Sequence, residues 1–136
     1  VFEAKQELTA DHMRYASEKA RSVRKLHRTS LSAVTINGPS RVKPLHHILA
    51  GTLTLGATWS PALGDTLLAH LKREEGDAVL DIGCVANAGW FERHQQEYEL
   101  HTVNKSATRF LFELIARLQR IGTAPMLDVR AYAEMI

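Results

Sequence analysis

The second half of the sequence alternates between helix-like and strand-like segments, and this alternation constrains the fold most strongly. Residues 106–121 form the clearest helix: Ser106 can cap its start, and Gly122 and Pro125 end it. Its apolar stripe consists of Phe110, Leu111, Leu114, Ile115, Leu118 and Ile121. The order helix, strand, helix, strand, helix over the second half predicts an α/β domain in which neighbouring strands run parallel.

The segments before that helix have their own start and stop signals. A helix is expected from Ser60 and Pro61 to Gly76, because Ser is a common N-cap and Pro suits the first helical position. Residues 77–83 read as a buried strand, residues 89–96 as a short helix and residues 98–104 as a further strand.

The first half begins with a long helical pattern from Glu3 to Arg28. Its apolar face comprises Met13, Ala16, Ala20, Val23 and His27. Residues 32–37 alternate like a strand, and residues 52–59 are β-like although Gly56 weakens them. We therefore expect an α/β (or α+β) fold in which a small, mostly parallel sheet is flanked by helices and a long N-terminal helix packs on it.

The 136 residues suit a single domain over 1–136 with one core, and 45% apolar with 24% charged residues is typical of a globular protein. No apolar run is long enough to span a bilayer, and the polar N-terminus is not a signal peptide. A single cysteine, Cys84, indicates a reducing cytoplasm. A homodimer formed through the segment that ends the chain, residues 131–136, would cover an unfinished sheet edge.

Basic residues gather on the predicted N-terminal helix although the net charge is only +2. Such a cluster is either a solvated helix face or a surface that binds nucleic-acid phosphates in a salt-dependent manner. The residues of this candidate surface are Arg21, Arg24, Lys25 and Arg28 on the helix, with Arg41 and Lys43 in the following loop.

The stretch VLDIGCVANAG, residues 79–89, resembles the first motif of class I S-adenosylmethionine-dependent methyltransferases. The resemblance implies a Rossmann-like fold over roughly residues 67–136, with Asp81 and Gly83 at the cofactor and Asn104 in place of the acid that binds the ribose. Val85 and Asn87 replace two glycines of the motif, so the implied cofactor site is degenerate. The alternative is an ordinary buried strand and turn.

Other catalytic patterns are weak. No two of the seven histidines have the i,i+4 spacing of a helical metal site, so no metal is expected. Cys84 would need exposure and a neighbouring base to act as a nucleophile. Asp81 and Asp128 could both end strands at one sheet edge.

These observations favour a non-enzymatic nucleic-acid-binding or regulatory module with no cofactor, although enzymatic activity stays open. One alternative is a degenerate methyltransferase-like domain that binds S-adenosylmethionine. The other is a protein-interaction or structural domain whose basic helix face only contacts water. Nucleic acid is the expected partner, and a membrane is not.

Overall fold

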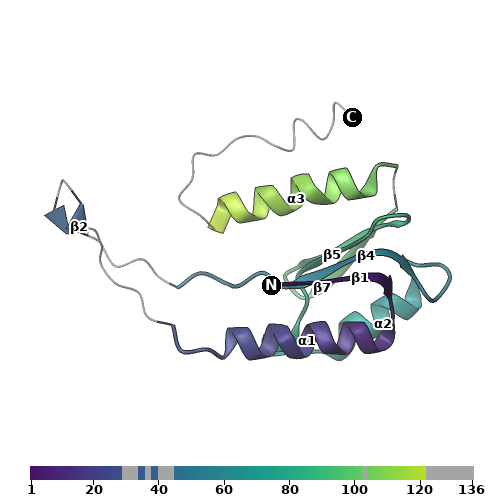
Figure 1. Ribbon diagram of the computed structural model, residues 1–136, viewed down its shortest axis with the longest axis horizontal. Coiled ribbons are helices and arrows are strands. Elements are labelled where there is room, and N and C mark those ends of the chain that lie inside the picture. The colour runs from purple at the N-terminus through teal and green to yellow at the C-terminus, as the bar shows by residue number, and fades with distance from the viewer. Residues whose placement is uncertain (29–33, 36–37, 40–44, 103, 122–136) are drawn as a thin grey trace.

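The computed structural model describes residues 1–28, 34–35, 38–39, 45–102 and 104–121. Within these ranges one sheet carries the fold (Figure 1). In chain order the elements are β1 (Phe2–Leu8), α1 (Ala10–Arg24), β2 (Val34–Thr35), β3 (Gly38–Pro39), β4 (Gly51–Ala57), α2 (Asp65–Arg73), a short 3-10 helix (Gly76–Ala78), β5 (Ile82–Val85), β6 (Gly89–His94), β7 (Glu97–His101) and α3 (Ser106–Ile121).

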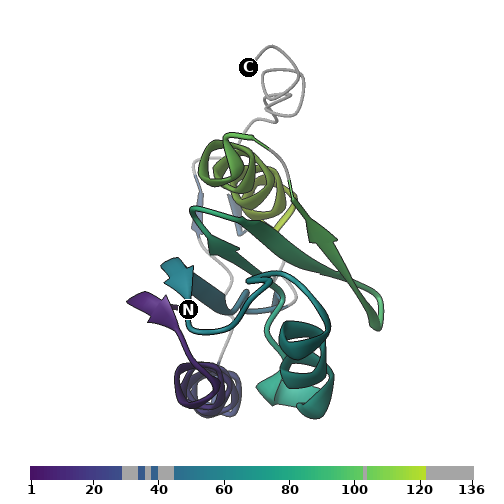
Figure 2. The same ribbon diagram turned by 90° about the vertical axis from the view of Figure 1, so that its right-hand side faces the viewer.

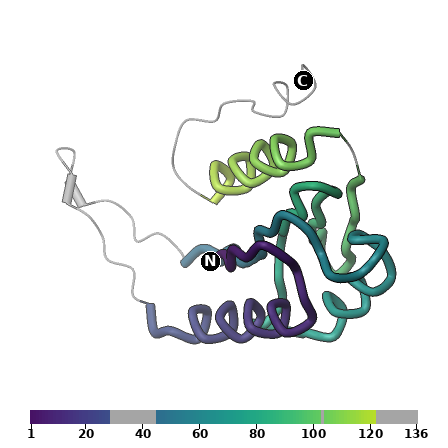
Figure 3. Tube along the Cα trace, turned by 45° about the vertical axis from the view of Figure 1, so that its right-hand side comes forward, coloured from purple at the N-terminus to yellow at the C-terminus, as the bar shows by residue number. Residues whose placement is uncertain are grey.

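The five-stranded sheet has the order β1-β4-β5-β6-β7. Strands β1, β4 and β5 run parallel, and β5, β6 and β7 form an antiparallel meander. The register places Glu3 beside Thr52 and Thr52 beside Gly83. The first strand of the chain therefore lies against residues about fifty positions further on, as the Cα trace shows (Figure 3).

Helices cover both faces of the sheet, with α1 and α2 on one side and α3 on the other (Figure 2). The larger core lies under α1 and α2 and contains Leu8, Met13, Leu67 and Phe91. The smaller core lies under α3 and contains Ile82, Cys84, Trp90 and Phe110. This arrangement confirms the predicted α/β class with a sheet flanked by helices. The parallel pairing expected between strands of the second half is wrong, because β5, β6 and β7 pair antiparallel. No helix in the described ranges is long and apolar enough to cross a membrane.

The N-terminal prediction of one helix from Glu3 to Arg28 is wrong, because residues 2–8 form β1 and the helix occupies only residues 10–24. Thr9 separates the two elements. Its backbone is extended and its side-chain oxygen accepts a hydrogen bond from the His12 amide at 3.1 Å, so it acts as the N-cap of α1. Met13, Ala16 and Ala20 are buried as the apolar pattern predicts.

Two further boundaries differ from the sequence pattern. The helix expected from Ser60 begins at Asp65, and its N-cap is Gly64. Residues 89–96 are expected to be helical, but residues 89–94 form the strand β6, because residues 89–92 are buried between the two helical layers and pair with β5. The helix from Ser106 is confirmed as α3, and the strand expected at 98–104 is present as β7 but ends at His101. Expectations for residues 32–33, 36–37 and 122–136 fall outside the described residues.

Candidate active site

A buried carboxylate lies between β1 and α1 with a lysine on each of its oxygens. Glu3 is 9% exposed, although it belongs to an edge strand of the described sheet. Lys5 Nζ lies 2.9 Å from Glu3 Oε1, and Lys19 Nζ lies 2.9 Å from Glu3 Oε2. Lys5 belongs to the same strand two residues on and therefore shares its face, whereas Lys19 comes from α1.

The two ammonium groups set the charge state of this site. The hydrogen bond from Lys19, followed by that from Lys5, holds the pKa of Glu3 below its usual value, so the carboxylate is ionised at neutral pH. The hydrogen bond to Glu3 in turn raises the pKa of Lys19. One negative and two positive groups leave the cluster with a net positive charge.

An open groove lies beside this cluster, where β1 and β4 end and the chain leaves β5. Lys5 reaches it from the cluster, and Leu55 and Gly56 of β4 form part of its wall. The remaining lining residues are Gln6, Glu7, Thr9, His12 and Asn87. Ligands of α/β folds commonly bind at the carboxyl ends of parallel strands, so the groove offers an approach to Lys5.

Arg24 has a structural position that the basic-surface hypothesis does not anticipate. Its side chain is 5% exposed, and its guanidinium lies 2.6 Å from Asp81 Oδ2. It also donates to the carbonyls of Ile48 and Val79 at 3.0 and 2.6 Å. These bonds occupy the guanidinium from several sides, which disfavours the predicted contact between Arg24 and a phosphate.

The other predicted nucleic-acid-binding residues are more dispersed than the sequence suggests. Arg21 is exposed and pairs with Glu74 at 3.0 Å, and Arg28 donates to the carbonyl of His46 at 3.0 Å. Lys25 is exposed just beyond the end of α1. Arg41 and Lys43 lie outside the described residues. Nucleic-acid binding by this set stays a prediction.

The geometry around Asp81, Gly83 and Asn104 does not form a cofactor site. Asp81 precedes β5 instead of following it, and it is bound by Arg24 and by the amide of Ala50 at 2.7 Å. Gly83 lies inside β5, where an added Cβ would meet the Phe91 ring at 2.4 Å. The strand continues into a hairpin with β6 and has no glycine-rich turn leading into a helix.

Cys84 faces the smaller core and is 3% exposed. Burial raises the pKa of its thiol to about 11, so the thiol is protonated at neutral pH. A protonated, enclosed thiol is a poor nucleophile, which makes Cys84 a packing residue.

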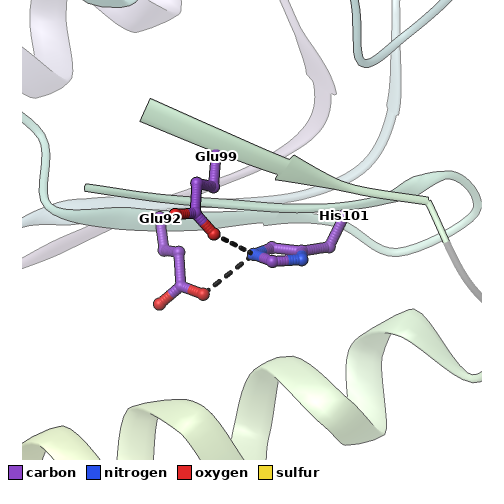
Figure 4. Close-up of side chains that lie close together, drawn as sticks. All are labelled: Glu92, Glu99 and His101. Atoms are coloured by element: carbon purple, nitrogen blue, oxygen red, sulfur yellow. Dashed lines mark hydrogen bonds and ion pairs between the residues drawn. The ribbon is translucent and has the colours of Figure 1, made fainter. Parts of the chain in front are cut away.

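Across the β6–β7 hairpin, two glutamates and a histidine approach one another (Figure 4). Glu92 lies opposite Glu99 in the register, and His101 Nε2 is 2.8 Å from Glu92 Oε1 and 3.9 Å from Glu99 Oε2. The ligand-type atoms lie within 4.8 Å of one another. Sequence spacing could not reveal this group, because only strand pairing brings the residues together.

The contacts of Glu92 identify this group as an ion-pair network. Arg117 of α3 places a guanidinium nitrogen 2.5 Å from Glu92 Oε2, and His94 lies 3.1 Å from the same oxygen. Both carboxylate oxygens are therefore engaged, and the Arg117 charge opposes an incoming cation. The network joins the hairpin to α3.

The pH dependence of unfolding should reveal the charge on Glu92. Burial alone raises the pKa of Glu92, but the hydrogen bond and charge of Arg117, together with His94 and His101, outweigh burial and lower it. A lowered folded-state pKa stabilises the protein above the unfolded value near 4.5, and this contribution disappears as pH falls through the folded value. Between the folded and unfolded pKa values of Glu92, the free energy of unfolding falls as pH decreases. Glu92→Gln should reduce this slope by up to about 1.4 kcal/mol per pH unit.

Urea unfolding at a series of pH values below 6 measures this slope. The matched control is Glu99→Gln, because the Glu99 side chain is 59% exposed and should leave the slope unchanged. Equal acid slopes for Glu92→Gln and the parent protein would contradict the assignment.

The chain is similar along its whole length to endodeoxyribonucleases. The relatives are two proteins named NucC: the one from Escherichia coli (strain MS 115-1) is 46% identical over 138 residues, and the one from Pseudomonas aeruginosa is 49% identical over the same length. The alignment covers 100% of this chain and 57% of each relative. No protein-family model matches the chain.

Solved structures of the same proteins have the same fold. The apo form of E. coli NucC superposes with a TM-score of 0.82 at 47% identity, over 99% of this chain and 61% of the other. The cAAA-bound form of P. aeruginosa NucC gives a TM-score of 0.86 at 49% identity, over 99% of this chain and 57% of the other. The chain thus spans little more than half the length of its relatives.

These similarities correct the methyltransferase resemblance, which is wrong. An extended match to endodeoxyribonucleases outweighs a short motif that has lost two glycines, and β5 lacks the turn that the motif requires. The coarser expectation of a nucleic-acid-related protein agrees with the names of the relatives. The residue pattern that went unnoticed is Glu3 and Lys5, whose two-residue spacing places them on one face of a strand.

Proposed function

We propose that this chain carries the DNA-cleaving centre of an endodeoxyribonuclease, and that Glu3 and Lys5 belong to it. The observation that carries the proposal is the buried, ionised Glu3 carboxylate with an ammonium group 2.9 Å from each oxygen. Endodeoxyribonucleases that are 46% and 49% identical over the whole chain support the assignment to DNA.

Glu3 supplies the kind of ligand that a divalent metal ion needs. Mg²⁺ prefers hard oxygen ligands and is often held by one or two carboxylates together with substrate phosphates and water. Glu3 could supply one such oxygen once a metal ion displaces one of its two lysines. The Lys5 and Lys19 side chains are 41% and 44% exposed and can move aside, whereas the Arg117 side chain on Glu92 is 11% exposed. A bound metal ion would polarise a phosphoryl oxygen and lower the pKa of a coordinated water.

Lys5 would act on the charge that develops during cleavage. Hydrolysis joins a water oxygen to phosphorus and breaks the bond between phosphorus and one sugar oxygen, which receives a proton from the water. Negative charge accumulates on the phosphoryl oxygens as this happens. The Lys5 ammonium, oriented by its ion pair with Glu3 and adjoining the open groove, would stabilise that charge electrostatically.

Rates of plasmid cleavage with MgCl₂ test this proposal in the complete protein that carries this chain. Glu3→Gln and Lys5→Met should each lower the rate by about 100-fold or more, which is typical when one preorganised charged group is lost from an active site. The control is Glu18→Gln, because this exposed glutamate on α1 pairs only weakly with Arg14 at 3.4 Å. Cleavage at the parent rate by Glu3→Gln would refute the proposal.

The predicted basic residues fit this function as additional contacts to the DNA backbone. On this view Arg21, Lys25, Arg28, Arg41 and Lys43 would neutralise phosphates of the substrate. The cAAA-bound forms of the two relatives, at 47% and 49% identity, also make cAAA a candidate ligand of the protein.

A further inference from the structure

Lys19 occupies a position that a simple ion pair does not require. Lys5 alone would neutralise Glu3, yet Lys19 reaches the same carboxylate from α1 at 2.9 Å. The second ammonium group gives the cluster surplus positive charge. A phosphodiester carries one negative charge per phosphate, which matches this surplus.

The Lys19 side chain is also open to solvent. It is 44% exposed, and the Lys5 side chain is 41% exposed, whereas the carboxylate between them is 10% exposed. An ammonium group has three N–H donors, and Glu3 accepts a hydrogen bond from Lys19 through one oxygen. Lys19 can therefore hold Glu3 and bind an anion outside the cluster at the same time.

The ring of Tyr15 restrains Lys19 in this position. Tyr15 lies one helical turn before Lys19 on α1, and the Lys19 ammonium is 4.5 Å from the centroid of its ring. A cation over an aromatic face is attracted electrostatically. This contact limits the rotamers of a long, exposed side chain, which lowers the entropy lost when it binds a ligand.

We propose that Lys19 contacts a phosphate of the DNA substrate beside the Glu3–Lys5 centre, and that Tyr15 holds its ammonium group in place for that contact. This inference rests on the proposed function for the identity of the substrate. The inference adds a role for Lys19 in substrate binding, while Glu3 and Lys5 stay the reacting centre of the proposed function.

DNA binding without cleavage tests the inference. Fluorescence anisotropy with a labelled duplex in EDTA, over a series of salt concentrations, gives both the affinity and its salt dependence. Lys19→Gln should weaken binding several-fold and reduce the slope of log K against log salt by about 0.9, as expected for one lost phosphate contact. Lys19→Arg should keep the slope, and Tyr15→Leu should weaken binding more than Tyr15→Phe.

Lys72→Gln is the matched control, because Lys72 is also a half-exposed lysine paired with a glutamate, at 3.4 Å on α2. Thermal unfolding of each variant verifies that it is folded.

An unchanged salt slope for Lys19→Gln would show that Lys19 only forms a structural ion pair, and would overturn the inference. If Glu3→Gln still abolishes cleavage, the proposed function survives that outcome. If Lys19→Gln reduces the salt dependence of DNA binding while Glu3→Gln cleaves DNA at the parent rate, the phosphate contact is supported and the catalytic assignment of Glu3 fails.

Discussion

Replacing Arg24 by leucine should lower the free energy of unfolding by about 3–5 kcal/mol, as expected when one partner of a buried ion pair is removed. Arg24 and Asp81 are 5% and 11% exposed at their side chains, so the substitution leaves a carboxylate without its nearest charge. The carbonyls of Ile48 and Val79 lose their donors as well. Urea unfolding followed by circular dichroism measures the change.

Arg21→Leu provides the control, since it makes the same change three residues earlier on α1. Arg21 is 45% exposed and pairs with Glu74, and an exposed pair contributes about 0–1 kcal/mol. Equal losses for the two variants would mean that the Arg24 network does not hold α1 to the start of β5. A DNA-binding loss in Arg24→Leu without any loss of stability would instead favour the surface role expected from the sequence.

Gly83→Val should lower the free energy of unfolding by about 3 kcal/mol, because the added side chain overpacks a closed core. A Cβ at this position would lie 2.4 Å from the Phe91 ring and 2.7 Å from Thr52 Oγ1. Phe91 is 0% exposed and Thr52 is 1% exposed, so neither side chain has space to move. Thermal unfolding of the variant measures the loss.

Gly56→Ala is the appropriate comparison, because its added Cβ would meet only the Asn87 side chain at 3.3 Å. It should change stability by less than about 1 kcal/mol. A double-mutant cycle adds a second test: Phe91→Leu in the Gly83→Ala background should cost less than Phe91→Leu alone. Additive losses would exclude contact between position 83 and the ring.

The elements with strong periodicity could be predicted from the sequence, and those defined by pairing could not. Helix α3 follows from its apolar stripe and from the capping signal of Ser106 in the sequence, and the helix begins at Ser106. Residues 3–8 are predicted to be helical because Glu3, Lys5 and Gln6 are common in helices. They form a strand instead, because β1 gains its stability from pairing with β4, some fifty residues away. Residues 89–94 likewise become a strand through pairing with β5 and β7.

The candidate site was missed for the same reason. Lys19 reaches Glu3 only when β1 and α1 fold back on each other through the cap at Thr9, and a single helix from residue 3 to residue 28 would not form that contact. The basic run is visible in the sequence, but burial separates its members. Charge spacing along a helix does not show that Arg24 faces the protein interior while Lys25 faces solvent.

The contacts of Arg24 and Arg28 hold together the two ends of the segment between α1 and β4. Arg24 donates to the carbonyl of Ile48 and Arg28 to that of His46, so the chain leaves and re-enters the sheet domain at nearly one point. Because the two ends are already joined, a change in the length of the intervening chain adds little loop-closure entropy. We therefore expect that residues can be inserted between α1 and β4 without altering the five-stranded sheet.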